Sequence, residues 1–580
     1  MGLPTGNGLK PIACDRVRRP HIPVILALSS VQALIVGAAT SAHQPAQCRD
    51  VAYRGELATR YGAATYNLVT RTDRYSPDTF RSNATCTPGA LWVDWPGDQS
   101  GRWFSVLHVA EGYGWTPASR QREATVDVVL PAQTEHGNFG RPLPYDDQDA
   151  RVPSGNAFAL RGLLDAYEDS GDARLLEAAR RLARYFEKAA PYWHDARDGH
   201  LHEYFGHCID GLVHLYLLGG DEFALDLAKN LASRAGRTAH THHSLSMYRG
   251  VLELYQITGD KRFLAPAEDY LEWCKECRTV DGAVPEMMPA SEQDEGCATA
   301  DYVVTNLMAF CATGRDAYVG EAEHVLVNHM MMTQFRTGGF GHRAFGQEVL
   351  GGRRWQGWDG QFGSENPGCC SLWGQWALGQ VGRFIVTDGE DAVEVNLYPE
   401  ATVELSVRGV RIDIASDFPR TSHATVTVHC DTPAQFALRL RVPAWVESGT
   451  ITVDGKAKPL PKGHRRVVVN REWRSGDTVK LRFDTGLRLV HRLTAGSPLV
   501  AVFDGPLCLG LSSAVADVNA YRRLLVGADG KPVTDDRGRP ILVSADGERL
   551  AGLAPVADDW LTPDVRNPNE IRVLFEETKA

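Results

Sequence analysis

Hydrophobic residues recur with a helical period from about residue 50 to residue 385. Three segments in this region resemble one another, because 162–167, 211–216 and 250–255 each run from a glycine to a tyrosine and precede a Gly-Asp pair. The pattern predicts helices that end at a glycine, with the aspartate capping the next helix. Spacings of 49 and 39 residues indicate helical hairpins stacked in series, as in an α/α toroid or solenoid whose inner helices line a central pocket.

The period changes after the polar stretch 388–391. Short segments with alternating residues follow, separated by turns rich in Asp, Gly and Pro, at 393–398, 410–414, 424–428, 436–442, 466–469 and 478–483. Such segments are typical of an antiparallel β-sandwich, and the alternation weakens beyond about residue 500. The chain is therefore predicted to be a multidomain α and β protein, with an N-terminal segment (1–49), a helical toroid (50–386), a β-sandwich (387–500) and a C-terminal β or irregular extension (501–580).

Length and composition agree with this division. A chain of 580 residues exceeds what one hydrophobic core usually organises, so two or more domains are expected. The content of 43% hydrophobic and 23% charged residues is that of an ordinary globular protein. The net charge of −11 gives no reason to expect a nucleic-acid partner, which requires a basic surface, and leaves neutral or small-molecule substrates open.

The N-terminus has the order of a secretory signal. Arginines within residues 16–19 precede an apolar run at 22–39 that ends in small residues, which favours export and a secreted or periplasmic location. Polar residues interrupt the run, so a signal anchor or a buried helix of a cytoplasmic protein are the alternatives. No other segment approaches the roughly twenty apolar residues that a membrane span needs.

Four potential metal ligands occur as two short pairs. Glu295 and Cys297 are two residues apart, and Cys369 and Cys370 are adjacent after a Pro-Gly turn. Three thiols and one carboxylate form a complete four-ligand set for zinc. Because residues so spaced point to different sides of a regular helix or strand, both pairs are expected at the ends of elements. A catalytic zinc site, a structural zinc site and a vicinal disulfide without metal are all compatible with these residues.

The predicted helix at 371–380 directly follows Cys370. The dipole at its N-terminus and a bound zinc ion would both favour the thiolate, which is a strong nucleophile as well as a zinc ligand. The same cysteines are thus candidates for catalysis.

Several motifs occur in an order that resembles glycoside hydrolase family 127, the β-L-arabinofuranosidase family. The resemblance covers most of residues 55–500 and is carried by Glu295-Gly-Cys297-Ala-Thr, Cys369-Cys370, Val395-Asn-Leu-Tyr398, Leu440-Arg-Val-Pro-Ala-Trp445 and Trp473-Arg-Ser-Gly-Asp477. It implies an (α/α)6 barrel followed by β-sandwich modules. It also implies a zinc-dependent glycosidase that releases L-arabinofuranose or a related sugar from plant or microbial glycans.

The resemblance assigns a role to each catalytic candidate. Glu295, Cys297, Cys369 and Cys370 would bind zinc, and Cys369 would attack the anomeric carbon to form a thioglycosyl intermediate with retention of configuration. The general acid/base would be Glu286 by its order along the chain. Its interval to Glu295 is shorter than the family usually shows, so Glu292 is the competitor.

Histidines are the candidates for contacts with the sugar. His207 matches a Gly-His motif of the family, and His240 lies where another substrate-contacting histidine is expected, with His242 and His243 close by. Neutral imidazoles suit hydroxyl recognition because they both donate and accept hydrogen bonds. A histidine whose hydrogen bonds are satisfied within the helix bundle is the alternative for each.

Two parts of the chain depart from the family pattern, residues 50–150 and the loop that carries Arg353-Arg354-Trp355. These are where sugar specificity would be set. Two other classes of function also fit the residues: a noncatalytic carbohydrate-binding or structural zinc protein, and a polysaccharide lyase or epimerase on the same toroid that relies on His and Tyr around His207 and His240.

Overall fold

A computed structural model describes most of the chain from residue 46 to residue 580. The described residues exclude 49, 89–92, 116, 142–144, 147–148, 150, 194–203, 292, 344–348, 351–352, 355–363, 366–367, 390–391, 461–465, 495–496 and 562–569. The signal-like segment, Glu292, Trp355 and the Asn366-Pro367 turn lie outside the described residues.

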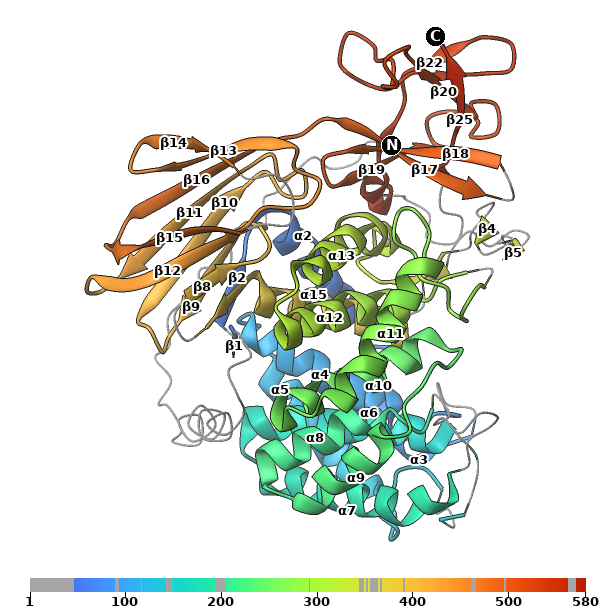
Figure 1. Ribbon diagram of the computed structural model, residues 1–580. Helices are drawn as coiled ribbons and strands as arrows, with labels where there is room; N and C mark the ends of the chain where they lie inside the picture. The colour runs from blue at the N-terminus through green and yellow to red at the C-terminus, as the bar shows by residue number, and fades with distance from the viewer. Residues whose placement is uncertain are drawn as a thin grey trace, which may run out of the picture.

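Six helices form a closed inner ring, in which each packs against the next and the last packs against the first (Figure 1). They are α4 (Asp98–Gly112), α6 (Arg151–Ser170), α8 (Cys208–Gly219), α10 (Thr241–Thr258), α12 (Gly296–Thr313) and α15 (Cys369–Ile385). The ring confirms the predicted helical barrel.

An outer layer of helices covers the ring. In the order of the inner helices that they cover, from α4 to α15, they are α5 (Ala118–Val129), α7 (Ala173–Ala189), α9 (Glu222–Ala232), α11 (Lys261–Cys277), α13 (Asp316–Val325) and α2 (Gly55–Thr70), and α3 (Pro77–Thr85) packs on α5. The outer helix α7 buries one face, whereas α12 is buried from Gly296 to Ala312. This difference follows from position, because an inner helix is enclosed on every side.

The three repeated segments lie in α6, α8 and α10, and their glycines act as predicted. Gly220 and Gly259 end their helices in the left-handed conformation, with φ values of 69° and 68°. Asp260 then caps α11. Asp221 precedes α9 without a side-chain capping bond, and its carboxylate binds Arg180 at 3.0 Å instead.

Glycines at the start of these segments let the inner helices approach closely. A Cβ atom on Gly162 would lie 2.2 Å from the carbonyl oxygen of Gly101, and one on Gly250 would lie 2.3 Å from the backbone nitrogen of Asp210. Only glycine allows such contacts without displacing a helix.

The β-sandwich consists of a seven-stranded and a five-stranded sheet, and it lies beside the barrel (Figure 1). The first sheet has the order β14 (Lys456–Pro459), β13 (Ser448–Val453), β16 (Asp477–Asp484), β11 (His423–Cys430), β10 (Val410–Ser416), β9 (Ala401–Leu405) and β2 (Asp50–Tyr53). The second has the order β1 (Ala46–Gln47), β7 (Val386–Asp388), β8 (Ala392–Val395), β12 (Ala434–Arg441) and β15 (Arg466–Trp473). Pairing is antiparallel except between β8 and β12, and the predicted sandwich is confirmed. Strands β1 and β2 belong to these sheets, although the barrel was expected to begin at residue 50.

Strands continue through the C-terminal region. One sheet contains β17 (Leu487–Thr494), β18 (Ser497–Asp504), β19 (Leu507–Ser512), β23 (Ala554–Pro555) and β24 (Ile571–Arg572). A smaller sheet contains β22 (Arg549–Leu550), β21 (Leu542–Val543), β20 (Arg523–Val526) and β25 (Glu576–Lys579). The side chain of Asn328 anchors the larger of these two C-terminal sheets to the barrel. It accepts a hydrogen bond from the Cys508 backbone nitrogen at 2.7 Å and donates one to the Pro506 carbonyl at 3.0 Å.

Residues of the Leu440–Trp445 motif join the sandwich to the barrel. The guanidinium of Arg441 and the indole of Trp445 both bind the buried carboxylate of Glu323 on α13. The motif therefore has a structural role at the domain interface. Among the described helices, none is long and apolar enough to cross a membrane.

Candidate active site

The predicted site residues gather at the N-terminal ends of four inner helices. His207, His240 and Glu295 directly precede α8, α10 and α12, and Cys369 is the first residue of α15. Helix N-termini carry partial positive charge, so this position favours anionic side chains such as thiolates and carboxylates.

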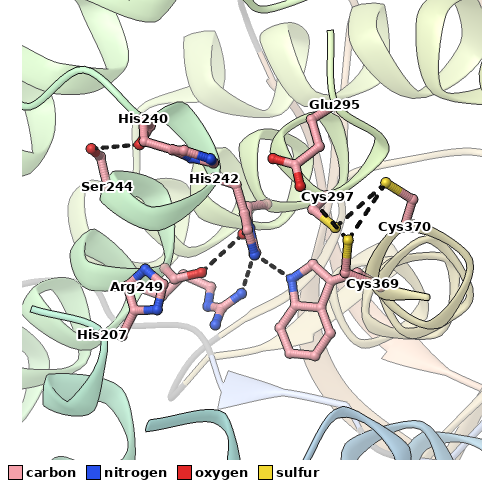
Figure 2. Close-up of polar contacts among 12 residues, drawn as sticks. His207, His240, His242, Ser244, Arg249, Glu295, Cys297, Cys369 and Cys370 are labelled. Carbon is pink, nitrogen blue, oxygen red and sulfur yellow. Dashed lines mark hydrogen bonds and ion pairs between the residues drawn. The ribbon is translucent and has the colours of Figure 1, made fainter. Parts of the chain in front are cut away.

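The four predicted metal ligands converge from two of these helices (Figure 2). The Sγ atom of Cys370 lies 3.8 Å from that of Cys297 and 3.9 Å from that of Cys369, and the Sγ atom of Cys369 lies 3.8 Å from Oε1 of Glu295. All four ligand atoms lie within 4.8 Å of one another. Sulfurs that surround a tetrahedral zinc ion at about 2.3 Å stand roughly 3.8 Å apart, so the spacing suits zinc. The described cysteines are free thiols, so the vicinal disulfide is not found.

A bend in the backbone brings Glu295 and Cys297 to the same side, as their spacing predicts. Glu295 is extended, with φ −129° and ψ 131°, and the helix begins at the next residue. A Cβ atom on Gly296 would lie 2.8 Å from the carbonyl oxygen of Gly341 and 3.1 Å from Cβ of Cys370. The glycine of this motif is thus required by the packing of the two ligand pairs.

The electrostatics of Glu295 fit a bound cation. Burial raises the pKa of its carboxyl well above the usual range, and the neighbouring Cys369 adds to the shift. Among the described residues, its Oε2 atom is buried without a hydrogen-bond partner. A buried carboxylate with an unsatisfied oxygen is costly, and a divalent ion would supply the missing partner.

The thiols differ in their tendency to ionise. Burial raises the pKa of Cys297 well above its usual range. Burial alone would do the same to Cys370, but hydrogen bonds from Cys297 and Cys369 lower its pKa to about 6. Cys369 differs in access, because it is the one member of the ligand set that is not fully buried.

Glu286 lies at the edge of this cluster. Oxygen atoms of Glu286 and Glu295 and a ring nitrogen of His240 lie within 4.8 Å of one another. The half-buried carboxylate of Glu286 accepts a hydrogen bond of 2.8 Å from the side chain of Gln293, and its backbone carbonyl accepts one of 2.9 Å from Thr241. The structure therefore brings the predicted acid/base next to a predicted metal ligand.

The four histidines divide into two kinds. The ring of His243 contacts those of His207 and His240, with centroids 4.3 and 4.0 Å away, and burial lowers the pKa of His207 and His243 well below the usual range. Nε2 of His207 and Nδ1 of His243 are buried without a hydrogen-bond partner among the described residues. By contrast, both ring nitrogens of His242 are used, one by Arg102 at 2.9 Å and one by Asp301 at 2.5 Å.

Two further polar residues, Arg102 and His342, lie beside the cysteines although no motif in the sequence predicts them there. Nη1 of Arg102 lies 3.9 Å from Sγ of Cys297, and Nε2 of His342 lies 3.8 Å from Sγ of Cys370. Arg102 is 195 residues away from Cys297 along the chain, in a region without a recognisable motif. Only the fold brings it to the site.

Comparisons with known proteins agree with this geometry. Residues 157–247 match the model of the GH127 β-L-arabinofuranosidase catalytic domain, and residues 392–485 match that of the GH127 middle domain. The first segment contains His207, His240 and His242, and the second spans most of the sandwich. No sequence among the curated proteins matches the chain.

Solved structures share the fold over nearly the whole chain. A GH127 β-arabinofuranosidase superposes with a TM-score of 0.71 at 16% identity and covers 92% of this chain and 98% of its own. A GH127 β-L-arabinofuranosidase from Geobacillus stearothermophilus T6 gives a TM-score of 0.70 at 16% identity, with coverage of 91% and 100%. A further structure, described as a glycoside hydrolase, gives 0.67 at 17% identity, with coverage of 92% and 98%. Likeness at such identities establishes the fold, and the two domain matches establish the family. The chain belongs to glycoside hydrolase family 127, the β-L-arabinofuranosidase family, and is a glycosidase.

Proposed function

We propose that this chain is a retaining glycosidase that uses Cys369 as its nucleophile and cleaves β-L-arabinofuranosides. The observation that carries the proposal is the convergence of Glu295, Cys297, Cys369 and Cys370, with Glu286 beside them. Cys369 alone among the four is partly exposed, which suits the residue that must reach a substrate.

Zinc is the metal that this donor set fits, and the four residues would all bind it. When bound, a zinc ion would keep the thiols ionised near neutral pH. The buried Oε2 atom of Glu295, which has no hydrogen-bond partner in the described part of the chain, and the sulfur spacing of 3.8–3.9 Å support this assignment.

The chain's own side chains account for both steps of hydrolysis. In the first step, Sγ of Cys369 attacks the anomeric carbon while Glu286 gives its proton to the leaving glycosidic oxygen, so that a C–S bond forms and the C–O bond breaks. In the second step, Glu286 takes a proton from water, the water oxygen attacks the same carbon, and the thiolate leaves. Two inversions give net retention.

Histidines beside the ligand cluster would recognise the sugar. His207 and His243 stay neutral near pH 7 and each carries a buried nitrogen without a protein partner among the described residues. Sugar hydroxyls can donate to and accept from such nitrogens. His242, whose two nitrogens are both occupied, would instead hold Arg102 and Asp301 in place.

L-Arabinofuranose is the proposed sugar because the related structures with the same fold are described as β-arabinofuranosidases. The test is a panel of 4-nitrophenyl glycosides that includes the β-L-arabinofuranoside, assayed with zinc analysis of the same protein. We expect about one zinc per chain and release of arabinose whose first-formed anomer, followed by NMR, retains the β configuration.

Matched variants separate the chemistry from the fold. Cys369→Ser should abolish turnover, whereas Cys430→Ser, a change in strand β11 of the sandwich, should leave it intact. Full activity of Cys369→Ser would refute the nucleophile, and an unsaturated sugar among the products would identify a lyase instead of a hydrolase.

A further inference from the structure

Arg102 reaches the sulfur cluster from the inner helix α4. It lies in the first turns of α4, and its Nη1 atom points at Sγ of Cys297 at 3.9 Å. Both side chains are buried. An arginine that is buried against a cysteine brings a permanent positive charge to it, because guanidinium does not lose its proton in proteins.

Hydrogen bonds and aromatic rings hold the guanidinium of Arg102 in place. Its Nε atom donates to Asp98 at 2.9 Å and its Nη2 atom donates to His242 at 2.9 Å. Its Cζ atom lies 3.7 Å from the ring centroid of Phe158 and 4.8 Å from that of Trp373. Because Nε is bound to Asp98 and Nη2 to His242, Nη1 is the nitrogen that remains for the sulfur of Cys297.

His242 completes this support. Arginine has only donors, so Nε2 of His242 accepts from Arg102, and the ring proton therefore sits on Nδ1 and is donated to Asp301. Asp301 in turn accepts bonds from Arg249 and from the indole of Trp373. The direction of the Nη1–H bond is thus set by a chain of buried groups.

The charge of the proposed zinc site explains why such a donor is needed. A divalent ion bound by three thiolates and one carboxylate carries a net charge of about −2, and burying that charge without compensation is costly. A hydrogen bond from a cation to one of the thiolates offsets part of this cost.

We propose that Arg102 is a positioning residue that donates a hydrogen bond to the thiolate of Cys297 and so stabilises the metal-bound form of the cluster. This inference rests on the proposed zinc site. Groups that support a metal ligand in this way typically change metal affinity by about 10- to 100-fold when they are removed.

The test compares Arg102→Met and Arg102→Lys with Arg60→Met. Arg60→Met is the matched control, because it removes a buried guanidinium of the barrel that donates to the Met331 carbonyl at 2.7 Å and does not belong to the contacts that orient Arg102. Zinc affinity is measured by competition with a chelator, and the absorption of the cobalt-substituted protein reports the sulfur-to-metal charge transfer. Circular dichroism of the metal-free proteins checks the fold.

We expect Arg102→Met to weaken zinc binding by about 10- to 100-fold and to move the cobalt charge-transfer band to longer wavelength, because a thiolate without its donor is more electron-rich. Arg102→Lys should recover part of both effects, and Arg60→Met should show neither. Wild-type affinity and an unshifted band in a folded Arg102→Met variant would overturn the inference, as would the same result in Arg102→Lys if Arg102→Met does not fold. If the wild-type protein itself binds neither zinc nor cobalt through sulfur, the proposed metal site fails, which is a distinct result.

Discussion

The Sγ atom of Cys369 lies 3.8 Å from Oε1 of Glu295, although 74 residues separate them along the chain. Cys369 is the first residue of α15 and Glu295 directly precedes α12, and these two inner helices pack side by side in the ring. Any change in the packing of these helix ends therefore alters the proposed nucleophile and a proposed metal ligand together. The geometry of the cluster depends on the barrel, and the barrel depends on close contacts such as those at Gly296.

Gly296→Ala tests this dependence. The new methyl group would lie 2.8 Å from the Gly341 carbonyl oxygen and 3.1 Å from Cβ of Cys370, so the start of α12 must move away from Gly341 and from the start of α15. We expect zinc affinity to fall, and the free energy of unfolding to drop by about 1–3 kcal/mol. The control is Gly320→Ala in α13, where nothing lies within 4 Å of the new methyl group. That change should stabilise the protein by about 0.5–1 kcal/mol, because alanine favours a helix interior more than glycine does. Equal effects of the two substitutions in denaturant titrations would contradict this account.

Cys297→Ala should remove the metal and the stability that the metal gives. Zinc present at a hundredfold excess over its Kd stabilises a folded protein by about 2.7 kcal/mol. Added zinc should therefore raise the Tm of the wild-type protein but not that of Cys297→Ala. Cys311→Ala is the matched control, since Cys311 is buried in the same helix and lies outside the ligand set. A zinc-dependent rise in the Tm of Cys297→Ala would remove this residue from the site.

The residue pattern predicted the ligand cluster because its two pairs are local. Cys369-Cys370 and Glu295-Gly-Cys297 each place two ligands within three residues, and the helical period placed both pairs near helix ends. Arg102 and His342 contact the same sulfurs through tertiary packing alone, so no local spacing in the sequence predicts their role. The C-terminal region was predicted only as a β or irregular extension, because strands of two residues such as β21 and β22 are too short to show alternation.

Glu286→Gln distinguishes the two acid/base candidates. The substitution keeps the shape of the side chain but removes the proton that the leaving group needs, so turnover of glycosides with poor leaving groups should fall by about 10²- to 10⁴-fold. Zinc content should not change, because Glu286 is outside the ligand set. Activated aryl glycosides need less protonation and should lose less activity in their first step. Glu292→Gln is the comparison, and a larger loss there than in Glu286→Gln would transfer the role to Glu292.

His243→Phe should weaken sugar binding, whereas His242→Phe should act mainly on zinc binding. The buried Nδ1 atom of His243 has no partner among the described residues, so a sugar hydroxyl is its expected partner. We expect a rise in KM, or a fall in kcat/KM by about 10-fold or more, with zinc content unchanged. His242→Phe should instead loosen Arg102 and reduce zinc affinity, since His242 binds Arg102 and Asp301. Identical kinetic and metal-binding changes in the two variants would show that they act through one shared effect.

The buried His329 should make stability depend on pH in the alkaline range. Burial alone would lower the pKa of His329, but Asp294 and Asp281, which bind its two ring nitrogens, outweigh burial and raise the pKa to about 9. The unfolded value is about 6.5, so the stabilisation is fully present below that pH and is lost as the pH rises through 9, by roughly 3 kcal/mol at most. Asp281 makes stability depend on pH in the acidic range. Its contact with His329 outweighs burial and lowers its pKa to about 2, so the stabilisation it gives is lost as the pH falls below about 4.

Denaturant unfolding of the metal-free protein at pH 7, 8 and 9 measures this effect. The wild-type protein should lose stability across this range relative to His329→Gln, which has no imidazole to deprotonate. Taking the difference between the two proteins removes the contribution of the thiols, which titrate in both. Parallel stability curves for the wild-type and His329→Gln proteins would mean that His329 is neutral in the fold at pH 7, and that its contacts with Asp281 and Asp294 are not ion pairs.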